Sequence, residues 1–288
     1  MSIGDFHTHS THSDGRLTPA ALVDLAASRG VRVMALTDHD TLDGLDDAIE
    51  AAAKHPGFRL IPGVELSCDV PGTEVHMLGL FVDSHDQRLI RELERFRRGR
   101  IERATKMVEA LARLGAPIEW ERVREIAGEA SIGRPHVAQA LLERGHIQTF
   151  DEAFERFLGR NGPAYFERER LTPREAIGLI RGAGGLPLFA HPSFTTDYEE
   201  VATALAADGL FGMETYYKAY EPELVETLRA LAERLGLFAL GGSDFHGIYD
   251  RKDEREPGDI PLPDAVVEAL LDAARTAGCE VPEATPAP

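Results

Sequence analysis

Short apolar runs alternate with helix-like segments at the start of the chain, and this alternation constrains the fold more than any other feature. Val31–Leu36 and Arg59–Val64 have the length and composition of buried strands, whereas Thr18–Arg29 and Leu42–Lys54 have helical patterns. Thr18, which precedes a proline, suits the N-cap of the earlier helix. Strands alternating with helices about every 30 residues predict a parallel sheet with helical crossovers.

The alternation stops at about residue 86, and only helical patterns follow until about residue 164. This stretch also differs in charge, because residues 88–170 carry 17 Lys/Arg and 14 Asp/Glu whereas the whole chain has a net charge of −18. Strand and helix patterns resume with the helix expected at Thr172–Ala183. We therefore expect a discontinuous barrel domain, residues 1–85 and 165–280, with a helical domain inserted at 86–164. A tail at 281–288, rich in Pro, Ala and Glu, is expected to be disordered.

Composition excludes several classes of protein. The two cysteines, Cys68 and Cys279, are too far apart in sequence to suggest a disulfide framework, and no apolar run approaches the ~20 residues that span a bilayer. The strong negative charge argues against a broad surface for duplex nucleic acid. These features predict a cytoplasmic protein that does not bind membranes.

Histidine and acidic residues stand directly after the apolar runs. His7 and His9, two residues apart, point the same way on an extended strand, and Asp14 follows them after a polar turn. Taken alone, this segment is either half of a metal site or a histidine-rich tail. The same two-residue spacing recurs near the other end of the chain, in Asp244 and His246.

The strand ends supply a set of nine candidate ligands in all. Because parallel barrel strands open their carboxyl ends onto one face, these side chains are expected to converge. The buried carboxylates among them would be costly without a cation. Nine mixed nitrogen and oxygen donors exceed the needs of one ion, which predicts two or three divalent ions of the Mn²⁺, Fe²⁺ or Zn²⁺ type. The nine are His7, His9, Asp14, His39, Glu65, His76, His191, Asp244 and His246.

The ordered motifs HxH…D, TDHD, GVE, AHP and GSDFH resemble those of the polymerase and histidinol phosphatase (PHP) superfamily. This resemblance implies an α/β fold, a distorted (β/α)7 TIM-like barrel, with a trinuclear phosphoesterase site. It also makes all nine residues metal ligands, with manganese expected first and iron or zinc as alternatives. Some PHP modules attached to polymerases have lost ligands and catalysis, and this chain shows no such loss.

Arginines mark the helical insert. Arg100 and Arg103 share one helical stripe with Phe96, Met107 and Leu114, and this stripe is expected to face protein. Arg134 precedes Pro135 at the start of a helix, where backbone amides favour anions. These positions alone leave open whether the arginines form ion pairs or bind an anion.

The RxxR pattern followed by R-x-H resembles that of small PHP phosphatases that act on nucleoside 3′,5′-bisphosphates, whose relatives include 5′→3′ exoribonucleases. The resemblance implies that three arginines hold the 5′-phosphate near His136, while the 3′-phosphate lies on the metals. The expected substrate is therefore a nucleotide or a short 5′-phosphorylated oligonucleotide. The arginines are Arg100, Arg103 and Arg134.

The expected reaction is attack by a metal-bound hydroxide on a phosphomonoester, with His246 as a candidate proton donor. His12 and Asp38 are expected to support the ligands. Three other interpretations stay open: a histidinol-phosphate-type phosphatase, a non-catalytic PHP binding module and an amidohydrolase. The amidohydrolases need a carbamylated lysine in the site, and the four lysines here fall in predicted helices or loops: Lys54, Lys106, Lys218 and Lys252.

Overall fold

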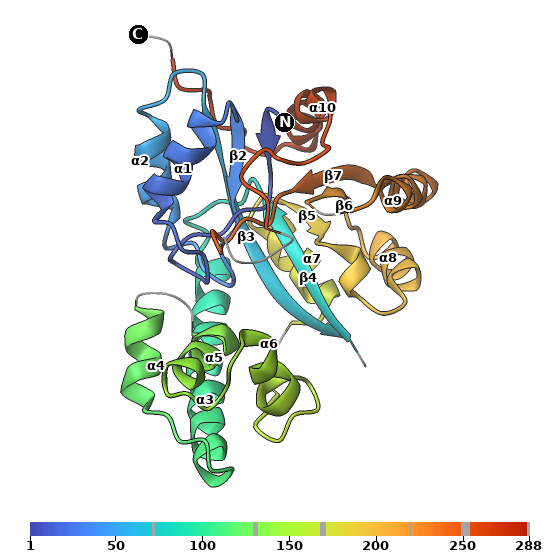
Figure 1. Ribbon diagram of the computed structural model, residues 1–288. Coiled ribbons are helices and arrows are strands. Elements are labelled where there is room, and N and C mark those ends of the chain that lie inside the picture. Colours follow the sequence, from blue (N-terminus) through green and yellow to red (C-terminus); the bar gives the residue numbers. More distant parts are fainter. Residues whose placement is uncertain (71–72, 129–131, 168–170, 219, 249–253, 287–288) are drawn as a thin grey trace. The chain divides into compact units, whose positions relative to one another are not determined.

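The computed structural model describes residues 1–70, 73–128, 132–167, 171–218, 220–248 and 254–286 (Figure 1). The chain divides into two compact units. The first consists of Met1–Arg91 together with Arg170–Pro288, and the second of Glu92–Glu169. Each unit has a hydrophobic cluster of its own.

The first unit is built on a seven-stranded sheet in which every strand neighbours the next in sequence. Just beyond the first and last strands, Thr8 and Phe245 form a parallel bridge, so the sheet is nearly closed into a barrel. The predicted α/β barrel is confirmed. Its strands are β1 (Gly4–Asp5), β2 (Val33–Leu36), β3 (Arg59–Val70), β4 (Thr73–Leu80), β5 (Leu186–Phe189), β6 (Gly212–Tyr217) and β7 (Phe238–Gly242).

Strand β4 runs antiparallel to both of its neighbours, whereas the other pairs are parallel. The prediction of a wholly parallel barrel is therefore wrong at this strand. Only two residues separate β3 from β4, and a parallel neighbour would need a crossover of a dozen residues or more. The reversal brings the start of β4 to the edge where the other strands end, and His76 pairs there with Ser67 of β3.

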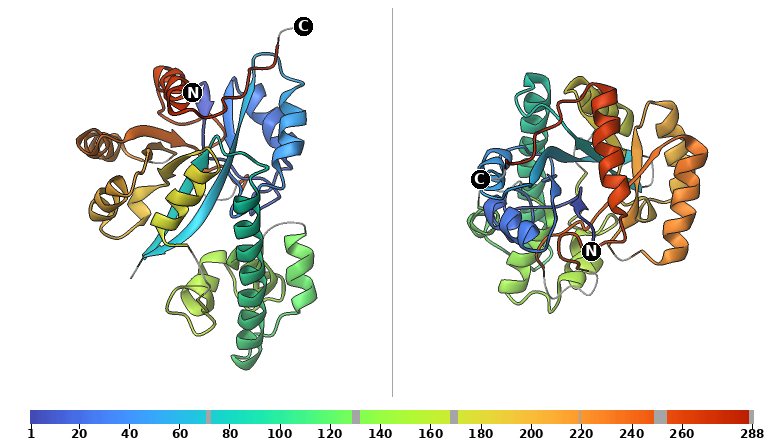
Figure 2. Two further views of the ribbon diagram at one scale, coloured as in Figure 1. Left: turned by 180° about the vertical axis from the view of Figure 1, so that it is seen from behind. Right: turned by 90° about the horizontal axis from the view of Figure 1, so that it is seen from above.

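Six helices surround these strands (Figure 2): α1 (Pro19–Ser28), α2 (Leu45–Ala52), α7 (Pro173–Gly182), α8 (Tyr198–Ala207), α9 (Pro222–Leu235) and α10 (Asp264–Ala277). The Thr18 hydroxyl accepts a hydrogen bond from Ala21 N at 3.2 Å, which confirms its predicted N-cap role. A short 3₁₀ helix, η2 (Pro192–Phe194), follows β5. No helix among the described residues is both long and apolar enough to cross a membrane.

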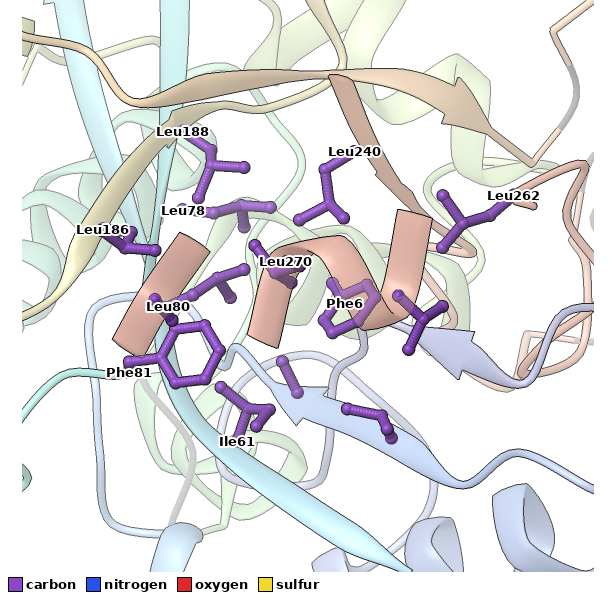
Figure 3. Close-up of a cluster of buried hydrophobic side chains, with 14 of the residues drawn as sticks. Phe6, Ile61, Leu78, Leu80, Phe81, Leu186, Leu188, Leu240, Leu262 and Leu270 are labelled. Carbon is purple, nitrogen blue, oxygen red and sulfur yellow. The ribbon is translucent and has the colours of Figure 1, made fainter. Parts of the chain in front are cut away.

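The barrel interior is filled by apolar side chains from most of the strands (Figure 3). Phe6, Leu78, Leu188 and Leu240 are fully buried there, and Leu270 of α10 packs into the same cluster. Helix α10 therefore covers one end of the barrel, opposite to the polar ends of the strands. Burial of such side chains, worth about 1.5–3 kcal/mol each, holds the strands in register.

The chain after α10 differs from the disordered tail that the sequence predicts. Thr285 donates its backbone N–H to Phe58 O at 2.8 Å and accepts from Gly57 N at 2.7 Å, and its hydroxyl donates to Ala52 O. The tail up to residue 286 thus runs beside α2 and the start of β3. Residues 287–288 lie outside the described part of the chain.

The second unit contains most of α3 (Gln87–Arg113), with α4 (Trp120–Ala127), α5 (Arg134–Glu143) and α6 (Phe150–Ala153), which continues into the π-helical turn η1 (Phe154–Leu158). Its core includes Met107 and Leu111 of α3. Leu114, predicted to lie on the buried stripe of α3, is instead 45% exposed. The helix has ended one residue earlier, and Leu111 fills the core.

Candidate metal centre

All nine predicted ligands of the first unit come together, and Glu65 lies at their centre. Its carboxylate is buried in the middle of β3. Polar residues that follow β2 and polar residues of β4 lie beside this part of β3. Five imidazole nitrogens lie between 2.7 and 3.2 Å from its two oxygens: those of His7, His9 and His39 at Oε2, and those of His76 and His191 at Oε1.

The donor atoms form three overlapping groups, and within each group they lie no more than 4.8 Å apart. Glu65 belongs to two of these groups, and His9 and His39 each belong to two. Asp14 and His246 complete the outer group, where His246 Nε2 is 3.3 Å from Asp14 Oδ1. The groups are His9–Asp14–His39–His246, His7–His9–Glu65–Asp244 and His39–Glu65–His76.

These contacts have the spacing of ligands on a shared ion. The Nδ1 atom of His39 is buried and lies 3.1 Å from Glu65 Oε2, yet it has no hydrogen-bond partner. Two donors bound to one ion at about 2.1 Å stand roughly 3.0–3.4 Å apart, with no hydrogen between them. Imidazole and carboxylate donors without thiolate suit Mn²⁺, Fe²⁺ or Zn²⁺. The residues therefore fit a divalent metal cluster.

Burial and neighbouring charge act in opposite directions on the ionisable groups here. Burial of the Glu65 carboxyl disfavours its charged form, but the imidazoles of His39, His7 and His76 hold its pKa well below the ordinary value. Burial also disfavours a proton on His9, yet the carboxylates of Asp244 and Glu65 raise the pKa of His9 to about 10. A divalent ion bound here would replace such protons, because imidazole ligates through a deprotonated nitrogen.

Asp38 anchors the turn between His9 and Asp14. Its carboxylate accepts hydrogen bonds from Ser10 N at 2.8 Å, Ser10 Oγ at 2.6 Å and Ser13 Oγ at 2.5 Å. Ser13 Oγ in turn lies 3.3 Å from His9 Nδ1, so Asp38 reaches a candidate ligand through one side chain. The ring of His12 lies instead beside Gly44, and its backbone N–H donates to Ser10 Oγ.

Sequence reasoning missed Glu214, which is fully buried in β6. Both of its carboxylate oxygens lie 3.2 Å from His7 Nδ1, and Oε2 accepts from His191 N at 2.7 Å. Because a carboxylate only accepts, Nδ1–H of His7 donates to Glu214, and Nε2, which lies 3.1 Å from Glu65 and 3.3 Å from Asp244, is the nitrogen that would bind an ion shared with these carboxylates. An acidic residue inside an apolar strand was the available signal.

Tyr217 and Lys218 were also missed. Tyr217 donates its hydroxyl to Asp244 Oδ2 at 2.6 Å, and Lys218 Nζ lies 3.2 Å from the same oxygen. The other carboxylate oxygen, Asp244 Oδ1, lies 3.3 Å from His7 Nε2 and 3.1 Å from His9 Nε2. Lys218, expected in a helix or loop segment, therefore reaches the site, where it pairs with Asp244. Lys218 follows β6 directly and is buried beside the Asp244 carboxylate.

We expect Tyr217→Phe to weaken metal binding about 10- to 100-fold, which is the usual cost of removing a group that orients a ligand. Phenylalanine keeps the aromatic ring and removes only the hydroxyl that donates to Asp244 Oδ2. Calorimetric titration of metal-free protein with Mn²⁺ measures the change. Tyr198→Phe, at the first residue of α8, is the matched control and should bind as the wild type does. An unaltered affinity in Tyr217→Phe would show that Asp244 needs no help from this hydroxyl.

Backbone conformation at the ligands is unusual. His191 and Asp244 adopt positive φ angles of 29° and 49°, a region that side chains other than glycine rarely occupy. Glu254 holds the backbone just after Asp244, because its Oε1 accepts hydrogen bonds from His246 N at 2.8 Å and from Gly247 N at 2.6 Å. His246 Nδ1 donates to Asp244 O at 2.8 Å, so its Nε2 lone pair faces the cluster. This tautomer suits a ligand, and a proton donor would need a second proton on the ring.

The predicted phosphate-binding residues lie in the second unit. Three of them adjoin the start of α5: Arg134 is its first residue, and a Cβ on the N-cap Gly133 would be 3.6 Å from Arg100 Nη1. His136 is buried, and its Nδ1 accepts from Gly133 N at 2.9 Å, so it caps the helix. Arg103 is 8% exposed on α3, with its guanidinium carbon 5.9 Å from the centre of the Tyr165 ring.

Comparison with known proteins adds a family and several relatives. A family model described as the PHP domain matches residues 5–158, more than half of the chain. The chain is similar to a 3′,5′-nucleoside bisphosphate phosphatase of Chromobacterium violaceum, with 34% identity over 84% of this chain and 86% of that protein. It is equally similar to a 5′-3′ exoribonuclease of Haemophilus influenzae, with 34% identity over 84% and 89% of the two chains.

Two solved structures resemble the whole chain. A Chromobacterium violaceum protein described as an amidohydrolase, solved with bound sulfate and no metal, has a TM-score of 0.85 and 31% identity, over 95% of this chain and 97% of its own. A Bifidobacterium adolescentis protein described as a metal-dependent phosphoesterase has a TM-score of 0.82 and 32% identity, over 93% and 95%.

Proposed function

The chain belongs to the PHP domain family, and on this premise we propose that it is a metal-dependent phosphoesterase that removes the 3′-phosphate of nucleoside 3′,5′-bisphosphates. The observation that carries the proposal is the donor cluster around Glu65, in which all six predicted imidazoles and all three predicted carboxylates come together. The name of the Chromobacterium violaceum relative supports the choice of substrate. The proposed products are a nucleoside 5′-monophosphate and phosphate.

The nine residues would hold two or three divalent ions, with Mn²⁺ as the first choice and Fe²⁺ or Zn²⁺ as alternatives. Such ions lower the pKa of water to generate a nucleophile and offset charge on a phosphoryl group. The side chains of the protein set the geometry for this chemistry. Glu214 orients His7 and Tyr217 orients Asp244, while Lys218 places a further positive charge beside the same carboxylate.

The other phosphate of the substrate is assigned to the second unit. We propose that Arg100, Arg103 and Arg134 bind the 5′-phosphate, because guanidinium groups match the geometry of phosphate oxygens. His136 would support this set by holding the start of α5. Resemblance of the RxxR and R-x-H motifs to the bisphosphate phosphatases underlies this assignment.

Short 5′-phosphorylated oligonucleotides form a second candidate substrate class. The exoribonuclease name of the Haemophilus influenzae relative favours it, since the two curated relatives match this chain equally well. The proposed setting is the cytoplasm, where nucleotides and RNA fragments occur. An amidohydrolase reaction is a weaker alternative, because Lys218 pairs with Asp244 and does not bridge ligands.

Turnover measured on a matched substrate panel tests the proposal. With Mn²⁺ present, adenosine 3′,5′-bisphosphate should be hydrolysed at least about tenfold more efficiently than adenosine 3′-monophosphate, because only the former offers a charge-assisted contact to the arginines. Histidinol phosphate should be a poor substrate. A preference for histidinol phosphate would indicate a histidinol-phosphate-type phosphatase. The absence of turnover on every substrate would indicate a non-catalytic binding module.

A further inference from the structure

An aromatic side chain stands exposed directly beside the metal centre. Phe194, the last residue of η2, is 64% exposed, and it is the one aromatic residue among the large hydrophobic side chains exposed in the described part of the chain. It therefore contributes little to the core. At this exposure the ring stays accessible to a molecule bound beside it.

Phe194 lies directly beside one of the candidate ligands, His191. Its centroid lies 5.3 Å from that of His191, whose Nε2 atom is 3.2 Å from Glu65 Oε1. The imidazole of His191 thus has one edge in the donor cluster and its ring beside the phenyl group. A molecule that is bound at the cluster and extends past His191 would reach Phe194.

Neighbouring side chains hold the phenyl ring of Phe194 and its helix in place. Tyr217 meets it edge to face, with centroids 5.8 Å apart and an interplanar angle of 86°. The hydroxyl of Tyr220 lies 2.8 Å from Ser193 Oγ and accepts from Ser193 N at 3.3 Å, which ties η2 to the residues after β6. A ring that already packs against two neighbouring rings loses little freedom when it binds a flat partner.

We propose that Phe194 is the residue on which the nucleobase of the substrate stacks. The inference rests on the proposed function, in which the 3′-phosphate binds at the cluster. Only the ribose ring lies between the 3′-oxygen and the base, so the base must lie close to the cluster. Stacking on an aromatic side chain accepts every base, because each has a π-face, and the larger purines should be favoured.

Two substrates that differ only in the base test this inference. Adenosine 3′,5′-bisphosphate and ribose 3,5-bisphosphate carry the same phosphates, but only the first can stack. Phe194→Leu should lower kcat/KM for the nucleotide by about 5- to 100-fold, the usual range for loss of one base–aromatic contact, and leave the base-free substrate unaffected. Phe194→Trp should keep the activity on the nucleotide.

A matched control is Ile49→Ala, which removes an exposed apolar side chain from α2 and should change neither substrate. If Phe194→Leu slows both substrates equally, Phe194 supports the metal centre and the stacking role is refuted. If it slows neither, no base contact exists. A wild-type protein inactive on both bisphosphates would refute the proposed function, whereas normal wild-type activity with an unaffected Phe194→Leu variant refutes only the stacking.

Discussion

Replacement of Glu65 by glutamine is expected to lower turnover of every phosphomonoester substrate by on the order of a thousandfold or more, because ligand charge and geometry both set metal-assisted hydrolysis. The two oxygens of this carboxylate meet five imidazoles, so each imidazole loses an anionic neighbour that lies within 3.2 Å of it. Glutamine preserves the shape but presents an amide that ligates metals poorly. His7→Ala and Asp244→Ala should have comparable effects.

Metal content distinguishes this expectation from a defect in folding. Elemental analysis of the wild-type protein should give two or three divalent ions per chain, and Glu65→Gln should give fewer while its circular dichroism stays unaltered. Glu50→Gln is the matched control, since this glutamate is exposed on α2 and its ion pair in the described part of the chain is with Lys54. Wild-type protein with at most one ion after Mn²⁺ supplementation would contradict a multinuclear centre. Full activity in Glu65→Gln would place catalysis elsewhere.

Replacement of Arg134 by alanine should lower kcat/KM for a nucleoside 3′,5′-bisphosphate by about 10- to 100-fold. A charge-assisted hydrogen bond to phosphate contributes about 1.5–3 kcal/mol, and each 1.4 kcal/mol corresponds to a factor of ten. A small phosphoester without a second phosphate should be hydrolysed at the wild-type rate, and the metal content should stay the same. The ratio of the two activities is therefore the measurement.

The control for this variant is Arg124→Ala, which removes an exposed arginine of α4 in the same unit. It should leave both activities unaltered. Equal losses on both substrates in Arg134→Ala would mean that the arginine supports the fold, through its contact with Phe154, where the guanidinium carbon lies 5.7 Å from the ring centre. The nucleotide assignment would then give way to a phosphatase of unspecified small molecules.

Much of the barrel was predictable because its signals are local. The strands are short apolar runs, and most candidate ligands lie in such a run or within a few residues of its end, so their position in the sequence identified them. Asp14 lies farther on, after the polar turn that follows His9. The direction of β4 was predictable in principle from the two residues that separate it from β3. The proline- and alanine-rich segment after α10 was wrongly predicted to be disordered, because its order depends on hydrogen bonds of Thr285 to residues more than 220 positions away.

The residues that orient the ligands could not be identified in the same way. Glu214 lies 207 residues from His7 in sequence, and nothing around Glu214 indicates a histidine partner. Tyr217 and Lys218 likewise acquire a role only when the end of β6 meets the residues after β7. Local patterns identify side chains that share a strand end, whereas contacts between strand ends depend on the register of the closed sheet.

The bridge between Thr8 and Phe245 has a consequence for biosynthesis. Asp244 N donates to His7 O, and His9 N donates to Phe245 O, so the backbone joins two parts of the donor set that lie far apart in the sequence. A ribosome-bound chain has released His7 and His9 long before residues 244–246 emerge. Contacts at such sequence separation form late and slowly. A nascent chain that has not reached residues 244–246 would therefore hold an incomplete set of ligands, and hydrolysis would begin only after these residues have been made.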